Sequence, residues 1–346
     1  MRSRQLWFSE PYRVEIRETP LREPAENELL VQSECSAISA GTEMLVYRGQ
    51  LPTDISLDAS LASLQGAATY PLQYGYACVG RVKRLGAAVD AGWLHKRVFS
   101  FQPHASHFIA APDQLLTVPD DIEPEAAVFL ANMETAVNLV LDGNPALGEK
   151  ALVLGQGVVG LLLSGVLARF PLAKLYALDG LAERRASALR LGVSQAFDPA
   201  NETQIASLKQ ALRLPVQLPA TAGSGADLVY EVSGAPEALN LAIDLCAYSG
   251  RIVIGSWYGG KAGAVRLGGA AHRHRIQFIG SQVSTIAPAL SGRWDKQRRF
   301  DLAWDMIRAL RPRRLISHRA VLGQAGNIYR LLDRTPEQAL QAIFIY

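Results

Sequence analysis

Cysteine is scarce in this chain of 346 residues, and its three cysteines, Cys35, Cys78 and Cys246, are far apart. This spacing provides neither a disulfide framework nor a Cys-x-x-Cys pair for a metal. Long apolar runs are missing too, since no stretch approaches the ~18 consecutive apolar residues of a membrane-spanning helix. The N-terminal stretch MRSRQLWFSE turns polar at once and lacks the apolar centre of a secretory signal. We therefore expect a protein of the reducing cytoplasm that does not enter a membrane.

An excess of charge is also missing, because 35 Lys and Arg against 32 Asp and Glu give a formal charge of +3. This balance gives no reason to expect nucleic acid as a partner. The basic stretches at 272–275 and 292–319 would attract an anionic substrate, although a solvated helix face explains them as well. The chain exceeds the ~250–300 residues at which a single core stops growing, so two domains are expected.

Two patterns of secondary structure divide the sequence. Before residue 123, short β-like runs such as 28–39 and 96–101 are separated by proline and glycine, which predicts a mostly antiparallel, barrel-like β domain. An irregular helical insert is expected at 53–70. After residue 123, apolar strand-like runs alternate with helical segments, which indicates a parallel sheet covered on both faces. The predicted fold class is α/β, with a β-barrel domain and a doubly wound Rossmann domain.

The strongest motif is a glycine-rich turn between a buried strand and a helix, KALVLGQGVVGLLLSG. Gly155, Gly157 and Gly160 have GxGxxG spacing: the first permits a tight turn, the second lets a pyrophosphate approach, and the third lets helix and strand pack closely. Val158 opens the helix, whose N-terminus would face the phosphates. The turn therefore predicts a dinucleotide site.

An acidic residue completes this motif. Asp179 follows Gly160 by 19 residues, at the end of the next strand-like run, where a carboxylate would accept hydrogen bonds from ribose hydroxyls. The same carboxylate would repel a 2′-phosphate, which favours NAD over NADP. Arg184 and Arg185 weaken this preference, because an arginine can accommodate that phosphate; a solvated helix face is the other interpretation of the pair. We expect NAD, with NADP as the alternative.

The order of these parts resembles the medium-chain dehydrogenase/reductase superfamily, which includes alcohol dehydrogenases and quinone reductases. The resemblance implies a GroES-like domain formed by residues 1–130 and 283–346, and a Rossmann domain formed by residues 131–282. It also implies a cleft between the domains and a homodimer formed through the cofactor domain. The similar stretches are ISAGTE (38–43), YGYACVGRV (74–82), ANMETA (131–136), GQGVVG (155–160) and LISHRA (315–320).

Zinc-dependent members of this superfamily hold the catalytic metal at three places. A cysteine before Gly-Thr/Ser-Asp/Glu corresponds here to Ala40, and the histidine of a Gly-His-Glu corresponds to Tyr76. The third place, a cysteine or an acid, falls on Ala131 or Asn132. Because a catalytic zinc needs about three N, S or O donors, we predict no metal and the zinc-free branch. Within that branch, ISAGTE, YPLQYGY and GSWYGG look most like the dehydrogenase that oxidises a hydroxyethyl side chain in bacteriochlorophyll synthesis.

Without a metal, hydrogen-bond donors must stabilise the reacting oxygen during hydride transfer. Thr42 matches the hydroxyl that relays a proton in the zinc enzymes. Tyr76 stands at the vacated ligand position, where a phenol could donate to a carbonyl oxygen or could simply fill the volume of the metal. Glu43 could orient Thr42, carry a proton, or be a stabilising carboxylate at a helix N-terminus. His104 could reach the site from the β domain or be structural.

Further cofactor contacts follow from the resemblance and from the rule that ligands lie beyond the carboxyl ends of parallel strands. Thr135, on the helix that enters the cofactor domain, matches a position that contacts the cofactor. Trp257 and Tyr258 follow one strand end as walls for a flat or bulky substrate, or as a cover for a domain or dimer surface. The strand-end residues expected at the cofactor are Ser233, Gly234, Gly255, Ser256 and Ser281.

The sequence therefore predicts an NAD(P)-dependent, zinc-independent oxidoreductase that acts on a secondary alcohol or ketone of a bulky or cyclic metabolite. An alternative in the same class is reduction of an activated C=C bond, as in zinc-free quinone and enoyl reductases. An alternative in another class is a non-catalytic NAD(P)-binding protein. The expected partners are a small-molecule substrate, anionic or bulky, and a second copy of the chain; neither nucleic acid nor a membrane is expected.

Overall fold

The computed structural model describes residues 1–51, 69–214 and 224–346. It divides into two compact units, which we call the β unit (Met1–Ala131 with Ile307–Tyr346) and the Rossmann unit (Asn132–Met306). The helical insert expected at 53–70 lies almost entirely outside the described residues. None of the helices that the structure describes combines the length and the apolar composition that crossing a membrane requires.

The β unit is built on a seven-stranded sheet in the order β14-β15-β3-β4-β5-β7, with β6 paired to β3. All of these pairs are antiparallel except β14 with β15. Alternate side chains such as Val31, Val82 and Phe108 are buried together, which is why these short runs form one sheet. The strands are β3 (Leu29–Ala37), β4 (Cys78–Leu85), β5 (Arg97–Ser100), β6 (His107–Ala110), β7 (Leu115–Thr117), β14 (Ile316–Val321) and β15 (Gln341–Ile345).

A separate hairpin of β1 and β2 braces two loops of the β unit. The backbone N–H of Leu6 donates to His104 O at 3.0 Å, and that of Phe8 donates to Leu72 O at 2.9 Å. These bonds fix the loops before β4 and after β5, which carry Tyr76 and His104. The hairpin strands are β1 (Arg2–Glu10) and β2 (Arg13–Pro20), and the α-helices of this unit are α1 (Ala40–Tyr47), α2 (Pro124–Ala127) and α9 (Ala325–Arg334).

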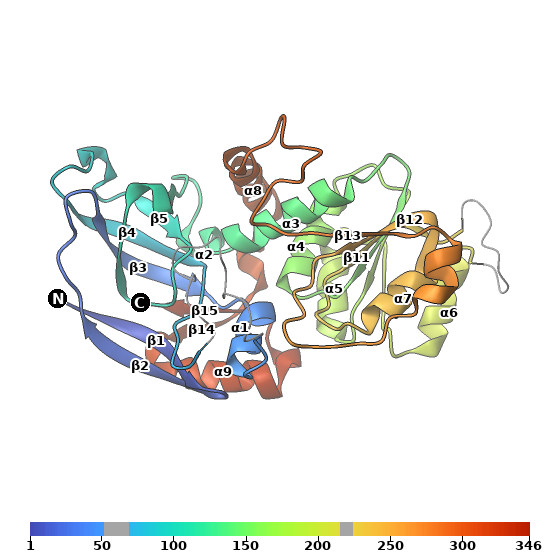
Figure 1. The fold of residues 1–346 in the computed structure, drawn as a ribbon, viewed down its shortest axis with the longest axis horizontal. Helices are drawn as coiled ribbons and strands as arrows, with labels where there is room; N and C mark the ends of the chain where they lie inside the picture. The colour runs from blue at the N-terminus through green and yellow to red at the C-terminus, as the bar shows by residue number, and fades with distance from the viewer. Residues whose placement is uncertain (52–68, 215–223) are drawn as a thin grey trace. The chain divides into compact units, whose positions relative to one another are not determined.

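The Rossmann unit contains a six-stranded sheet in the order β10-β9-β8-β11-β12-β13, of which β11, β12 and β13 are labelled in Figure 1. Every neighbouring pair is parallel. Counted from β8, this is the order 3-2-1-4-5-6 of two mononucleotide-binding halves, so the predicted doubly wound sheet is confirmed. The strands are β8 (Lys150–Leu154), β9 (Lys174–Leu178), β10 (Gln195–Phe197), β11 (Ala226–Glu231), β12 (Cys246–Ile254) and β13 (Gln277–Gly280).

Helices accompany this sheet because the strands are apolar on both sides and need cover on both faces. Gly160 allows the first of them, α4, to approach β8, since a Cβ at that position would lie 1.9 Å from Gly155 O. The helices are α3 (Leu130–Gly143), α4 (Val158–Leu167), α5 (Ala182–Arg190), α6 (Glu202–Ala211), α7 (Ala238–Leu245) and α8 (Lys296–Leu310).

The boundary predicted at 282/283 differs from the one observed at 306/307. Residues 283–306 belong to the Rossmann unit, and a buried arginine explains why. Arg299 is 0% exposed and donates to Glu134 Oε1 at 2.6 Å and to Asn138 Oδ1 at 2.6 Å, both on α3. Burial raises the pKa of Glu134, although Arg299 opposes the shift. The ion pair therefore fastens α8 to α3.

Candidate catalytic and cofactor sites

Three hydroxyl groups meet in the β unit and form what we call the hydroxyl cluster: Ser39, Thr42 and Tyr76. The Tyr76 hydroxyl lies 3.1 Å from Thr42 Oγ1 and hydrogen-bonds to Ser39 Oγ. Ser39 starts α1, because its carbonyl accepts from the backbone N–H groups of Thr42 and Glu43 at 3.0 and 2.8 Å. Thr42 and Tyr76 are half-buried, so solvent reaches them. Each hydroxyl can donate and accept, which makes the cluster suited to proton transfer.

Glu43 points away from this cluster into the core and is 0% exposed. Its Oε1 accepts from the Ser39 backbone N–H at 2.7 Å, and its Oε2 accepts from the Tyr329 hydroxyl. Burial, together with the Glu43 carboxylate, raises the pKa of Tyr329 well above its usual value, so the phenol remains a donor. Ser39 thus connects Glu43 to Tyr76, with its backbone on one side and its hydroxyl on the other.

His104 is equally buried, at 1% exposure, and lies beside the same carboxylate. Its Nε2 is 3.0 Å from Glu43 Oε2 and its Nδ1 is 2.7 Å from Ser36 Oγ, so both ring nitrogens are engaged. The φ of +128° at Gly75 lets the backbone cross the ring, since a Cβ there would lie 3.0 Å from Nε2. Glu43 and His104, predicted as catalytic, are thus both buried, and Glu43 is linked to the hydroxyl cluster through Ser39.

The positions that hold zinc in the zinc-dependent enzymes carry poor ligands here. Ala40 opens α1 with a methyl group, and the Tyr76 phenol is engaged with Ser39 and Thr42. Within residues 1–51, 69–214 and 224–346, no group of three or more His, Cys, Asp or Glu side chains is placed to hold a metal ion. The donor set therefore does not fit a catalytic zinc.

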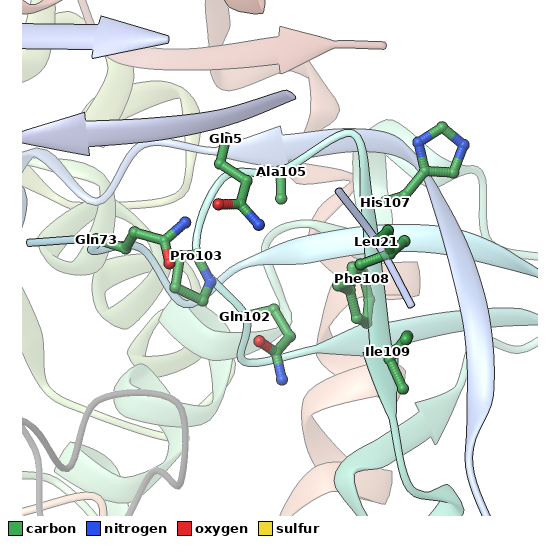
Figure 2. A pocket seen from close by; sticks show the side chains of 9 residues that line it. All are labelled: Gln5, Leu21, Gln73, Gln102, Pro103, Ala105, His107, Phe108 and Ile109. Carbon is green, nitrogen blue, oxygen red and sulfur yellow. The ribbon is translucent and has the colours of Figure 1, made fainter. Parts of the chain in front are cut away.

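A pocket of about 190 Å³ opens on the β unit, and the loops before β4 and after β5 contribute to its lining (Figure 2). Gln73 and Gln102 line it together with Gln5 of β1, while the ring of His107 points away from its centre (Figure 2). Burial lowers the pKa of His107, so the lining residues that the structure describes carry no charge near neutral pH. No member of the hydroxyl cluster lines this pocket, which is thus separate from the candidate catalytic groups.

In the Rossmann unit, the three motif glycines divide by what surrounds them. Gly155 has a φ of +94°, and a Cβ there would lie 2.6 Å from Ser233 Cα. At Gly160 the Gly155 carbonyl oxygen leaves no room for a Cβ. A Cβ at Gly157, in contrast, would meet nothing within 4 Å. The first and third glycines thus serve packing, whereas the open space at Gly157 and the N-terminus of α4 at Val158 fit a pyrophosphate.

Asp179 lies beside this turn and is held by two backbone donors. Its Oδ2 accepts from Gln156 N at 2.7 Å, and its Oδ1 accepts from Leu181 N at 2.8 Å. The side chain follows β9 at the carboxyl edge of the sheet, as the motif predicts. A carboxylate oxygen can accept further hydrogen bonds, so Asp179 fits the ribose role.

Ser233, Gly234, Gly255 and Ser256 lie together after β11 and β12, where Gly234 N donates to Ser256 Oγ at 2.8 Å. Ser281 differs from them, because its hydroxyl donates to Asp142 Oδ2 of α3 at 2.6 Å. The Ser281 side chain is thus engaged in holding β13 to α3. Thr135 is half-buried on α3.

Sequence reasoning missed Ser39, Tyr329 and Glu231. Ser39 lies inside the ISAGTE motif, and Glu231 ends an apolar run with a charge, which signals a buried polar group with partners. Tyr329 gave no such signal, because its partner Glu43 is 286 residues away.

A parallel sheet of order 3-2-1-4-5-6, with a glycine-rich turn after its first strand and an acid after its second, defines a dinucleotide-binding protein. The family model described as zinc-binding dehydrogenase matches residues 159–299. An L-threonine 3-dehydrogenase of Stenotrophomonas maltophilia is 24% identical over 69% of this chain and 72% of its own length. A D-xylulose reductase of Aspergillus oryzae is 28% identical over 44% of this chain and 41% of its own length.

Solved structures share the whole fold at low identity. A 2R,3R-butanediol dehydrogenase of Bacillus subtilis has a TM-score of 0.77 and 17% identity and covers 99% of both chains. An alcohol dehydrogenase of Escherichia coli in complex with NADH has a TM-score of 0.79 and 16% identity and covers 100% of this chain and 99% of its own. The family match over part of the chain and the dehydrogenase relatives support an NAD(P)-dependent oxidoreductase, similar to the zinc-type alcohol dehydrogenases.

Proposed function

We propose that the protein interconverts a secondary alcohol and a ketone of a bulky or cyclic metabolite, with NAD and without zinc. One observation carries this proposal: the Tyr76 hydroxyl is held by Ser39 and Thr42 at the position where the zinc enzymes hold a metal ligand. The activities named for the threonine and butanediol dehydrogenases concern secondary alcohols, which supports the substrate class.

The hydroxyl cluster would supply the proton chemistry. The nicotinamide, when bound, supplies or accepts the hydride. In the reductive direction, the Tyr76 O–H donates to the carbonyl oxygen and gives up its proton as negative charge develops there. Ser39 and Thr42 then turn their O–H groups toward the phenolate oxygen and stabilise its charge. Glu43 keeps Ser39 in place through its backbone N–H. Oxidation reverses these steps.

The preference for NAD over NADP rests on Asp179 and its two neighbouring arginines. Arg185 donates to Asp179 O at 2.7 Å and lies 3.3 Å from Asp198 Oδ2, so its charge is engaged within the unit. Arg184 lies 4.0 Å from Asp179 Oδ2. A 2′-phosphate would have to approach the carboxylate to reach Arg184, which disfavours NADP.

We also propose a cytoplasmic homodimer. The three cysteines are buried thiols, and burial raises the pKa of Cys78 to about 12, which suits a protein with no need of disulfides. β13 is an edge strand of the Rossmann sheet, and its Phe278 is 39% exposed, so a second copy would cover it. Size-exclusion chromatography with light scattering tests this, since a monomer at micromolar concentration would rule the dimer out.

The decisive experiment combines metal analysis with a substrate panel. We expect purified protein to hold much less than one zinc per chain and to consume NADH with a cyclic or bulky ketone. With deuterated NADH, label on the carbinol carbon supports the proposal, whereas label β to a carbonyl supports C=C reduction instead. NADH binding without turnover of any ketone, enone or alcohol would support the non-catalytic alternative.

A further inference from the structure

A second buried carboxylate ties together the ends of two strands in the Rossmann unit. Glu231, the last residue of β11, is 0% exposed. Its Oε1 accepts from Ser233 N at 2.8 Å and from Ser233 Oγ at 2.5 Å. Its Oε2 accepts from Tyr258 OH at 2.5 Å. We call Glu231, Ser233 and Tyr258 the strand-end latch.

Further hydrogen bonds join the same two loops. Gly255 N and Ser256 N donate to Glu231 O at 2.9 and 3.2 Å, so the carbonyl of Glu231 is used as well as its carboxylate. Lys261 Nζ donates to Gly234 O at 2.8 Å. The loop that follows β12 is thus fastened to the turn that follows β11 at its start, at Tyr258 and at Lys261.

Tyr258 is held firmly in this arrangement. Its side chain is half-buried against the core of the unit, and burial, together with the Glu231 carboxylate, raises its pKa, so that it remains a donor. Tyr258 was predicted as a wall for a flat or bulky substrate or as a cover for a domain or dimer surface, and its hydroxyl donates to Glu231. Trp257 beside it is 38% exposed and is free of that constraint.

The position of the latch within the sheet defines which part of a dinucleotide it would affect. Asp179 and the glycine turn belong to the half formed by β8, β9 and β10, which takes the adenosine and the pyrophosphate. β11, β12 and β13 form the other half, beyond whose carboxyl ends the nicotinamide nucleotide would be held. The latch also touches the boundary between the halves, because Ser233 packs on Gly155.

We propose that Tyr258, acting through Glu231 and Ser233, is a positioning residue for the nicotinamide half of the dinucleotide site. This inference rests on the proposed function, because it requires NAD as the ligand. Deleting the hydroxyl leaves a buried carboxylate oxygen without its donor, so the loop 255–261 becomes less ordered before binding. Binding of NADH must then order the loop 255–261 again, and the entropy cost of this ordering weakens the affinity. The adenosine half of the site keeps its geometry.

The test compares two ligands on Tyr258→Phe: NADH, which has the nicotinamide nucleotide, and ADP-ribose, which lacks the nicotinamide ring. We expect NADH to bind to the variant roughly fivefold to tenfold more weakly than to the wild type. This weakening corresponds to part of the free energy of one charge-assisted hydrogen bond. We expect the affinity for ADP-ribose to change by less than about twofold. Isothermal titration calorimetry measures both.

Tyr230→Phe is the matched control. Tyr230 precedes Glu231 on β11, and its buried hydroxyl has no hydrogen-bond partner among the described residues. Its loss should leave both affinities unchanged. A Tyr258→Phe protein that binds NADH like the wild type would overturn the inference, and so would equal weakening of both ligands, which indicates a merely structural role. Failure of the wild type to bind either ligand would instead overturn the proposed function.

Discussion

Among the described residues, each unit of this protein buries one carboxylate completely and surrounds it with hydrogen-bond donors. Glu43 in the β unit and Glu231 in the Rossmann unit are both 0% exposed. Each accepts from a serine backbone N–H and from a tyrosine hydroxyl. In both, the carboxylate fixes a serine turn beside a candidate functional surface.

The two carboxylates differ in how far away their donors lie in the sequence. The side-chain partners of Glu43 are His104 and Tyr329, at separations of 61 and 286 residues. Those of Glu231 are Ser233 and Tyr258, at separations of 2 and 27 residues. Glu43 therefore joins distant segments of the β unit, whereas Glu231 orders a local pair of loops.

The largest expected effect follows from this difference. Glu43→Ala should lower the free energy of unfolding by about 4 kcal/mol, because donors from distant segments are left buried without an acceptor. Urea denaturation measures the change. Glu34→Ala is the control, since Glu34 pairs with Arg81 and Arg97 near the surface and should contribute within about 1 kcal/mol. Equal losses for the two variants would contradict the account of Glu43.

Glu231→Ala should have a smaller effect, about 2 kcal/mol, because its donors belong to loops where water can replace the carboxylate. The same urea denaturation experiment compares the losses of unfolding free energy in the Glu231→Ala and Glu43→Ala variants. A loss at Glu231 as large as that at Glu43 would show that sequence separation does not set the difference.

Alkaline pH provides a further comparison. Tyr329 has a raised pKa in the folded protein, so above about pH 10 the unfolded chain loses the proton while the folded chain retains it. The contribution of the Tyr329 hydroxyl to the free energy of unfolding is therefore complete below about pH 10, and it falls by about 1.4 kcal/mol per pH unit above that pH. Tyr329→Phe should show a shallower decline in unfolding free energy between pH 10 and pH 11 than the wild type. Parallel declines would contradict the raised pKa.

The smallest expected change in stability is for a substitution at Gly157. This substitution distinguishes a glycine that faces a ligand from the glycines that serve packing. Gly157→Ala should change the unfolding free energy by less than about 1 kcal/mol, since its Cβ meets open space, yet weaken NADH binding by crowding the pyrophosphate. Gly160→Ala is the contrasting variant, because its Cβ would lie 1.9 Å from Gly155 O and should unfold the unit. Unchanged NADH affinity in Gly157→Ala would place the pyrophosphate elsewhere.

The sequence was most informative where the chemistry is local. The glycine turn, Asp179 and the alternation of strands and helices predicted the parallel sheet, because each depends on residues close in the chain. Thr42 and Tyr76 were placed by motif, and the structure brings them within 3.1 Å. The domain boundary at 306/307 depends on Arg299 reaching Glu134, a separation of 165 residues that no local pattern encodes.

The same reasoning applies to the surroundings of Glu43, His104 and Ser281. Glu43 lies in the ISAGTE motif and His104 follows the β-like run at 96–101, but local sequence patterns do not show which side of a loop faces solvent. Their burial arises from α9 and from the β1 hairpin, elements remote in sequence. Ser281 likewise follows a strand end as predicted, yet Asp142 of α3 engages its hydroxyl.

The most direct measurement is the NADH-dependent reduction of a bulky or cyclic ketone by protein stripped of zinc. We predict that the stripped wild type keeps its turnover rate and that Tyr76→Phe lowers kcat by about 100-fold with little change in KM. Loss of turnover on stripping, restored by adding zinc, would contradict the role of the hydroxyl cluster.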